Sequence, residues 1–193
     1  MKILGIVLII VAAMILISGV ALARHGLFAT VTISEQNSGP HLLVYQKHIG
    51  DYKNVGAVMD DLFNDLKDNY AIETTKGFGL YYDNPREVSM DELRSIVGCI
   101  VEGLTMDDLA SVSKKYGVKE FPASESVVAE FPYTGKVSIM LGIMKVYPKL
   151  SKYLEENNFV NTPIMEIYDL PNEQIQYVAS PNVGSEVFSA FLE

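Results

Sequence analysis

The chain has 193 residues, 15 of them basic and 24 acidic, and a formal charge of −9. An acidic chain with scattered lysines and arginines excludes nucleic acid as a partner, because binding to phosphates needs clustered basic residues. The same charge disfavours anionic lipid headgroups and predicts that contact with a bilayer stops at any anchor, so a cationic or neutral partner is expected.

The first segment, Ile3–Ala23, has 21 residues without a charge. This length matches a hydrocarbon core of about 30 Å and predicts a transmembrane anchor over residues 1–26. A cleaved export signal is the alternative, because Ala21–Ala23 has the small-x-small pattern, but its apolar stretch is usually only about 7–15 residues. The flanking charges do not fix the orientation. A single cysteine, Cys99, and the lack of an Asn-x-Ser/Thr sequon favour a domain that faces the cytosol.

Residues 27–193 contain enough apolar residues for one domain with a core. Apolar residues at helical spacing predict two helices, one over Val55–Leu66 and one over Met140–Leu154. A short helix, Met106–Tyr116, is expected to join two halves. Strands are predicted before and after each long helix, at Phe28–Ser34, Leu42–His48, Gly79–Asp83 and Ser95–Val101, then at Val118–Phe121, Val127–Phe131, Ile164–Tyr168 and Ile175–Ala179.

The two halves share a pattern at an offset of 86 residues, which aligns Leu80–Asp83 with Glu166–Asp169 and Tyr45 with Phe131. We therefore predict an α+β fold, in which two tandem β-β-α-β-β units form an antiparallel sheet with pseudo-two-fold symmetry. Such a duplication leaves a cleft along its internal axis. At this offset Tyr82 is expected across the axis from Tyr168.

Glu166 is the candidate ligand-binding residue, because it is an acid inside an otherwise apolar strand. Strand alternation places Glu166 and Tyr168 on one face. A carboxylate between Tyr82 and Tyr168 would attract an organic cation or a flat ligand, since water screens it less there. The alternatives are a solvated strand face for Glu166 and packed core tyrosines for Tyr82 and Tyr168.

Other reactive residues point to ordinary structural roles. Helical spacing assigns Met59, Met140 and Met144 to the core, with a role as cleft walls as the alternative. Cys99 is expected to be a small buried hydrophobic residue. The three histidines, at positions 25, 41 and 48, lack the spacing of metal ligands, and no nucleotide-binding loop or nucleophile elbow occurs. We therefore predict no metal, no cofactor and no catalytic residue.

The pentapeptide Tyr81–Pro85, followed by an apolar strand and later by Pro163–Tyr168, resembles the gyrase-inhibitor-like family, the effector-binding domain of bacterial multidrug-responsive transcription activators. The resemblance spans about Thr30 to Ser180. It implies a small-molecule-binding domain in which Glu166 lies in the ligand cleft and compensates cationic drugs.

The apolar N-terminus, Tyr81–Pro85, Phe121–Ala123 and Phe131–Thr134 are similar to a membrane-anchored receptor for autophagy of the endoplasmic reticulum within that family. This likeness implies an adaptor at that membrane that faces the cytosol and recruits protein partners. Some family members hydrolyse strained small molecules, a chemistry in which Glu166 would be the base and Tyr168 the proton donor. Our leading prediction is an anchored ligand sensor or adaptor, not a catalyst.

Overall fold

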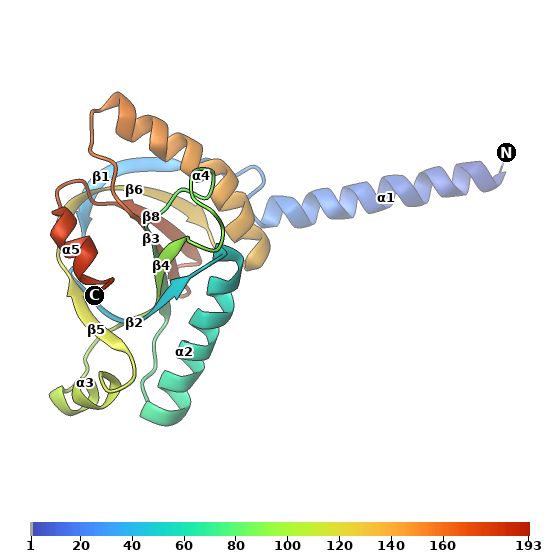
Figure 1. The fold of residues 1–193 in the computed structure, drawn as a ribbon. Coiled ribbons are helices and arrows are strands. Elements are labelled where there is room, and N and C mark those ends of the chain that lie inside the picture. Colours follow the sequence, from blue (N-terminus) through green and yellow to red (C-terminus); the bar gives the residue numbers. More distant parts are fainter. Residues whose placement is uncertain (1) are drawn as a thin grey trace.

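The computed structural model describes residues 2–193, and its eight strands form one antiparallel sheet (Figure 1). An N-terminal helix, α1 (Lys2–Arg24), precedes the sheet domain. The first half consists of β1 (Thr32–Ser38), β2 (His41–Ile49), a 3-10 turn (Tyr52–Asn54), α2 (Val55–Tyr70), β3 (Lys76–Tyr81) and β4 (Arg94–Val101). After α3 (Met106–Val112) the second half consists of β5 (Gly117–Phe121), β6 (Ser124–Pro132), α4 (Lys136–Glu156), β7 (Ile164–Asp169), β8 (Gln174–Ala179) and α5 (Ser185–Ala190).

The strand order β1-β6-β8-β7-β3-β4-β2-β5 confirms the predicted pseudo-two-fold architecture. The order is unchanged when the two halves are interchanged and the sheet is reversed. The first strand of each half pairs with the other half, because β1 pairs with β6 and β5 pairs with β2. At the centre of the sheet, β3 and β7 are adjacent and antiparallel.

The sheet curls around α5, while α2 and α4 lie on its outside (Figure 1). On the inner face, Phe188 and Phe191 pack in a cluster with residues from seven of the strands. The carbonyl oxygens of Phe188, Ala190 and Leu192 accept hydrogen bonds from the side chains of Tyr82, Lys119 and Lys47. These donors hold the C-terminal end of α5 and the residues just beyond it against the inner face of the sheet. Helix α5 is not among the elements predicted from the sequence.

On the outer face, the helices pack in two further clusters. Cys99 is buried under α2, as predicted, and burial raises the pKa of its thiol to about 12. The prediction for α4 is wrong at its N-terminal half, where Met140 is 65% exposed and Met144 is 70% exposed. The helix instead buries Ser138, Gly142, Val146, Leu150 and Leu154. Two small residues let the first turns of α4 approach the sheet, a contact that hydrophobic spacing does not reveal.

Three strands differ from the prediction by three or four residues at one end or at both, among them β6, which begins at Ser124 and not at Val127. β1 begins at Thr32, and its polar residues are paired with β6 along its whole length, so the sheet partner overrides weak strand propensity. β3 ends at Tyr81, which leaves Tyr82 just beyond the strand.

The helix α1 projects from the sheet domain (Figure 1). Residues Ile3–Arg24 form a helix long and apolar enough to cross a membrane, and none of it is buried in the domain. Length and composition alone do not separate an anchor from an export signal, so the division into residues 1–26 and 27–193 stays a prediction.

Gly98 is a test of how tightly the central strands pack. It lies on β4 between Tyr45 and Phe78, and a Cβ at this position would lie 2.9 Å from Cα of Tyr45 and even nearer to the carbonyl oxygen of Val44. We expect Gly98→Ala to lower the free energy of unfolding by about 1–3 kcal/mol or more, because backbone atoms must move. Denaturant unfolding of the full chain measures this change.

Gly56→Ala is the matched control. A Cβ at Gly56, in the first turn of α2, meets nothing within 4 Å. The substitution should leave stability unchanged or raise it by about 0.5–1 kcal/mol, through the lower chain entropy of alanine. Equal effects of the two substitutions would contradict the packing described for Gly98.

Candidate functional site

The candidate site lies where the two halves meet, on the outer face of the sheet. Gly79 of β3 pairs with Glu166 of β7. Tyr81 and Tyr168 each lie two residues beyond this pair on their own strands, and side chains two apart share a face. The local two-fold axis therefore passes beside the Gly79–Glu166 pair, with one tyrosine on either side.

The carboxylate of Glu166 is 2% exposed, and tyrosine hydroxyls donate to both of its oxygens. The Tyr168 hydroxyl donates to Oε2 at 2.6 Å, and the Tyr147 hydroxyl, from α4, donates to Oε1 at 2.7 Å. Two phenol donors partly replace the water that the carboxylate loses on burial. The site thus joins the centre of the sheet to α4 through one acidic side chain.

Further aromatic rings surround this contact. The Tyr147 ring meets the Tyr177 ring edge-on, with centroids 5.6 Å apart, and the Tyr133 ring lies 5.9 Å from that of Tyr168. The Tyr177 hydroxyl is buried and has no hydrogen-bond partner within the described chain. Glu166 therefore lies in an aromatic environment with an unused hydroxyl group in it.

Glycines in β3 make room for these rings. A Cβ on Gly79 would lie 2.7 Å from the hydroxyl oxygen of Tyr81, so this hydroxyl lies back over its own strand. A Cβ on Gly77 would lie 2.9 Å from Sδ of Met59 on α2. The strand opposite Glu166 therefore lacks side chains at the two positions where Tyr81 and Met59 pack.

The ionisation of the site is set by burial. Burial raises the pKa of the Glu166 carboxyl, and the hydrogen bonds from Tyr168 and Tyr147 oppose this rise. Burial and the negative charge of Glu166 both raise the pKa of Tyr168 and of Tyr147. None of the groups that shift the pKa of Glu166 is a cation. Once ionised, this carboxylate has phenol donors but no counterion among residues 2–193, an arrangement suited to a positively charged ligand.

The structure brings Glu166 and Tyr168 together but places Tyr82 on the other face of the sheet. Tyr82 packs against the inner cluster, and its hydroxyl donates to the carbonyl oxygen of Phe188 at 2.9 Å. The 86-residue offset aligned the Tyr-Asp pairs at the strand ends and missed the register by one residue, which moves a side chain to the opposite face. Tyr81, the neighbouring residue, occupies the position expected for Tyr82.

Tyr147 was missed because it falls within the apolar stripe of a helix, where a tyrosine predicts a core residue.

Two surface hollows, of about 260 Å³ and about 30 Å³, lie elsewhere, and Glu166 lines neither. Within residues 2–193, no group of three or more histidine, cysteine or acidic residues could hold a metal ion. The predicted axial cleft is thus closed around Glu166 by the protein's own tyrosines.

Comparison with known proteins gave consistent matches. The model of a family described as the GyrI-like small molecule binding domain matches residues 33–188. Testis-expressed protein 264 homolog of Mus musculus is 31% identical over 153 residues, which are 74% of this chain and 47% of that protein. Testis-expressed protein 264 of Homo sapiens is 32% identical over 142 residues, which are 70% and 43% of the two chains. The chain thus spans less than half the length of these curated relatives.

Among solved structures, the crystal structure of the EcmrR C-terminal domain shares the fold. It aligns with a TM-score of 0.52 at 13% identity and covers 78% of this chain and 98% of that one.

The raised pKa of Glu166 predicts a specific pH dependence of stability. An acid whose folded pKa exceeds its ordinary value of 4.5 stabilises the fold most below pH 4.5, and that contribution is lost as pH rises through the folded pKa. Relative to Glu166→Gln, the native chain should therefore lose stability as pH rises above 4.5. Denaturant unfolding of both proteins across this range measures the difference, and a constant difference would refute the assignment.

Proposed function

Because this chain belongs to the GyrI-like small molecule binding domain family, we propose that it is a single-pass membrane protein whose domain binds a small organic ligand, cationic or neutral, beside Glu166. It works as a sensor or adaptor, not as a catalyst. The observation that carries this proposal is the buried Glu166 carboxylate, which has two phenol donors and, in the part of the chain that the structure describes, no cationic partner.

An organic cation would supply the missing counterion. The faces of tyrosine rings attract cations, and a desolvated carboxylate interacts more strongly with one than an exposed carboxylate does. Both features occur around Glu166, where Tyr168 and Tyr147 contact the carboxylate directly. A neutral aromatic ligand would use the same rings without the charge.

Ligand entry requires one of the enclosing tyrosines to move, and Tyr147 is the one held on a helix. It is half-buried, whereas Tyr168 is buried on a central strand. The next residue, Pro148, lies inside α4 and has no backbone N–H to donate to the preceding turn, which weakens the helix at this point. These features support an outward shift of Tyr147 as the opening step.

The anchor in this proposal is α1, and the domain faces the cytosol at the endoplasmic reticulum. The length and apolar surface of α1 support insertion, and the similarity to the testis-expressed proteins supports the placement.

A second candidate function is a protein adaptor in autophagy or quality control of that membrane. Two observations favour it: the sequence similarity to the testis-expressed proteins, and a Glu166 site that is already filled by tyrosines. In that case Glu166 has a structural role, and a protein partner binds the domain surface. The hydrolase alternative would use the same Glu166–Tyr168 pair as base and proton donor.

The test is binding of the fluorescent aromatic cation rhodamine 6G to the full chain in detergent, followed by fluorescence anisotropy. We expect Glu166→Gln to weaken binding at least about tenfold, because it removes the charge and keeps the shape. Glu120→Gln, at an exposed position on β5, is the matched control and should bind as the native chain does. Tyr147→Ala should tighten binding by opening space beside the carboxylate.

Equal binding by the native chain and Glu166→Gln, or no binding even by Tyr147→Ala, would overturn the ligand site. Capture of the same protein partner by the native chain and by Glu166→Gln would then favour the adaptor. Chemical conversion of a strained substrate that Glu166→Gln abolishes would favour the hydrolase.

A further inference from the structure

The N-terminal half of α4 presents an apolar surface that the domain does not cover. Met140 and Met144, one helical turn apart, are 65% and 70% exposed, and Val137 and Ile143 beside them are also exposed. These four residues are the α4 patch. The buried line of the helix, through Gly142 and Val146, faces the sheet, so the patch points away from it.

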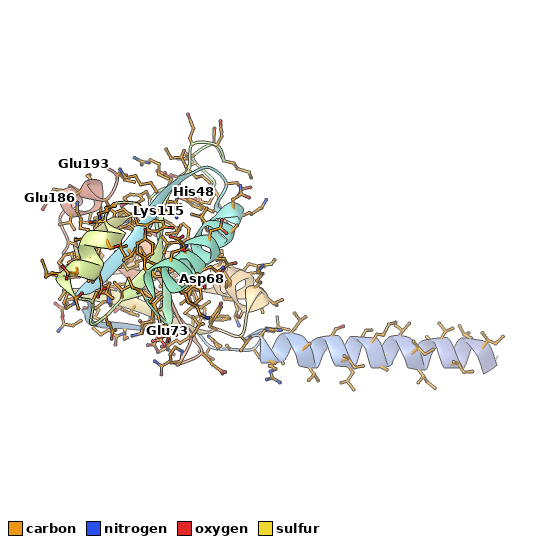
Figure 2. The ribbon with its side chains drawn as sticks, turned by 90° about the horizontal axis from the view of Figure 1, so that it is seen from below. His48, Asp68, Glu73, Lys115, Glu186 and Glu193 are labelled. Atoms are coloured by element: carbon orange, nitrogen blue, oxygen red, sulfur yellow. The ribbon has the colours of Figure 1, made fainter. Side chains whose placement is uncertain are left out.

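The α4 patch lies on the most basic helix of an acidic protein. Four lysines, at positions 136, 145, 149 and 152, occur on α4, and no acidic residue lies between Lys136 and Leu154. The acidic residues of α4, Glu155 and Glu156, lie at its C-terminal end, away from the patch. Glu186 and Glu193 are at the end of the domain far from α1 (Figure 2). An apolar strip on a helix with an excess of lysines is typical of a helix that lies in a membrane interface.

The chain holds this helix beside the end of α1. Nζ of Lys145 donates to the carbonyl oxygens of Gly26, Leu27 and Ala29, at 3.3, 2.8 and 2.6 Å. His25 hydrogen bonds to the Thr134 hydroxyl at 2.7 Å, just before α4 begins. Residues 25–29, which join α1 to the domain, are therefore held by Thr134 just before α4 and by Lys145 within α4. Figure 1 shows the N-terminal end of α4 beside the base of α1.

We propose that the α4 patch docks on the surface of the bilayer that α1 spans, with Met140 and Met144 among the lipid headgroups and Lys136, which is exposed one helical turn before Met140, near anionic lipids. This inference rests on the anchoring proposed above. If α1 crosses the membrane and ends at Arg24, a helix tied to residues 26–29 lies at the level of the headgroups. Methionine side chains adapt to an irregular surface, and lysines within a Debye length are attracted to anionic lipid.

Docking of the α4 patch on anionic lipid differs from the expectation, drawn from the net charge, that the domain is repelled by anionic headgroups. The overall charge of −9 predicts repulsion from anionic headgroups, but charge acts over a distance of about 8–10 Å in physiological salt. What a bilayer meets is the local charge of α4, which is positive. The acidic end of the domain then faces the aqueous phase.

The test uses the full chain reconstituted in phosphatidylcholine vesicles that contain phosphatidylserine. An environment-sensitive fluorophore is attached at one of three new cysteines: Met144→Cys in the α4 patch, Met106→Cys on α3, or Ile10→Cys within α1. Met106 is the matched control, because it is 80% exposed and α3 lies far from α1 (Figure 1). Native Cys99 is buried and should stay unlabelled.

Quenching by lipids brominated near the headgroup end of the acyl chains reports insertion. We expect the probe at position 144 to be quenched several-fold more than the probe at 106, and this excess to fall when Lys136→Glu is added or phosphatidylserine is removed. Quenching at position 10 together with equal, weak quenching at 144 and 106 would overturn docking and leave the anchor intact. Failure of quenching at position 10 would refute the anchor and, with it, this inference.

A second copy of the chain is the other possible cover for the α4 patch. If the probe at position 144 were shielded only at high protein-to-lipid ratio, and not by lipid itself, the patch would be a contact between copies and the proposal would be wrong.

Discussion

The fold is organised around the buried carboxylate of Glu166, whose oxygens need hydrogen-bond donors. A charged or polar group at the centre of a sheet destabilises the protein unless hydrogen bonds replace its water. Glu166 meets this requirement with a hydroxyl from its own strand, on Tyr168, and one from α4, on Tyr147. The second bond fixes α4 over the sheet, and Lys145 of the same helix fixes the segment that leads from α1. The candidate ligand site and the C-terminal end of α1 are thus both attached to α4.

The exchange of first strands makes the two halves a single cooperative unit. Because β1 completes the sheet of the second half and β5 that of the first, neither half can separate without breaking a full set of ladder hydrogen bonds. The curled sheet also encloses α5, and Tyr82, Lys119 and Lys47 donate hydrogen bonds to carbonyls at the end of α5 and just beyond it. Movement in this domain is therefore expected in the outer helices and not between the halves.

Local apolar spacing predicted the eight strands and both long helices in their order, although not α5, and the repeat at an offset of 86 residues predicted the pseudo-two-fold sheet. Strand alternation also placed Glu166 and Tyr168 on one face, where the structure has them in a hydrogen bond; their role as a ligand site stays a prediction. The repeat failed where a register shift of one residue moves a side chain to the other face of the sheet. Tyr82 was expected beside Glu166, but Tyr81 lies there. Apolar spacing failed on α4, because the small residues Ser138 and Gly142 carry no hydrophobic signal although both are buried.

The Gly79–Glu166 pair beside the two-fold axis shows what becomes possible when both copies of a duplicated unit lie in one chain. A β-β-α-β-β unit made alone would lack its outer strand and would have to be completed by an identical copy, as in an intertwined homodimer. Identical copies would set like residues against each other at the axis, and two facing carboxylates resist joint ionisation. In one polypeptide the two equivalent positions can carry different residues, so Gly79 pairs with Glu166. Covalent linkage therefore allows a solitary negative group at a location where symmetry would otherwise demand two or none.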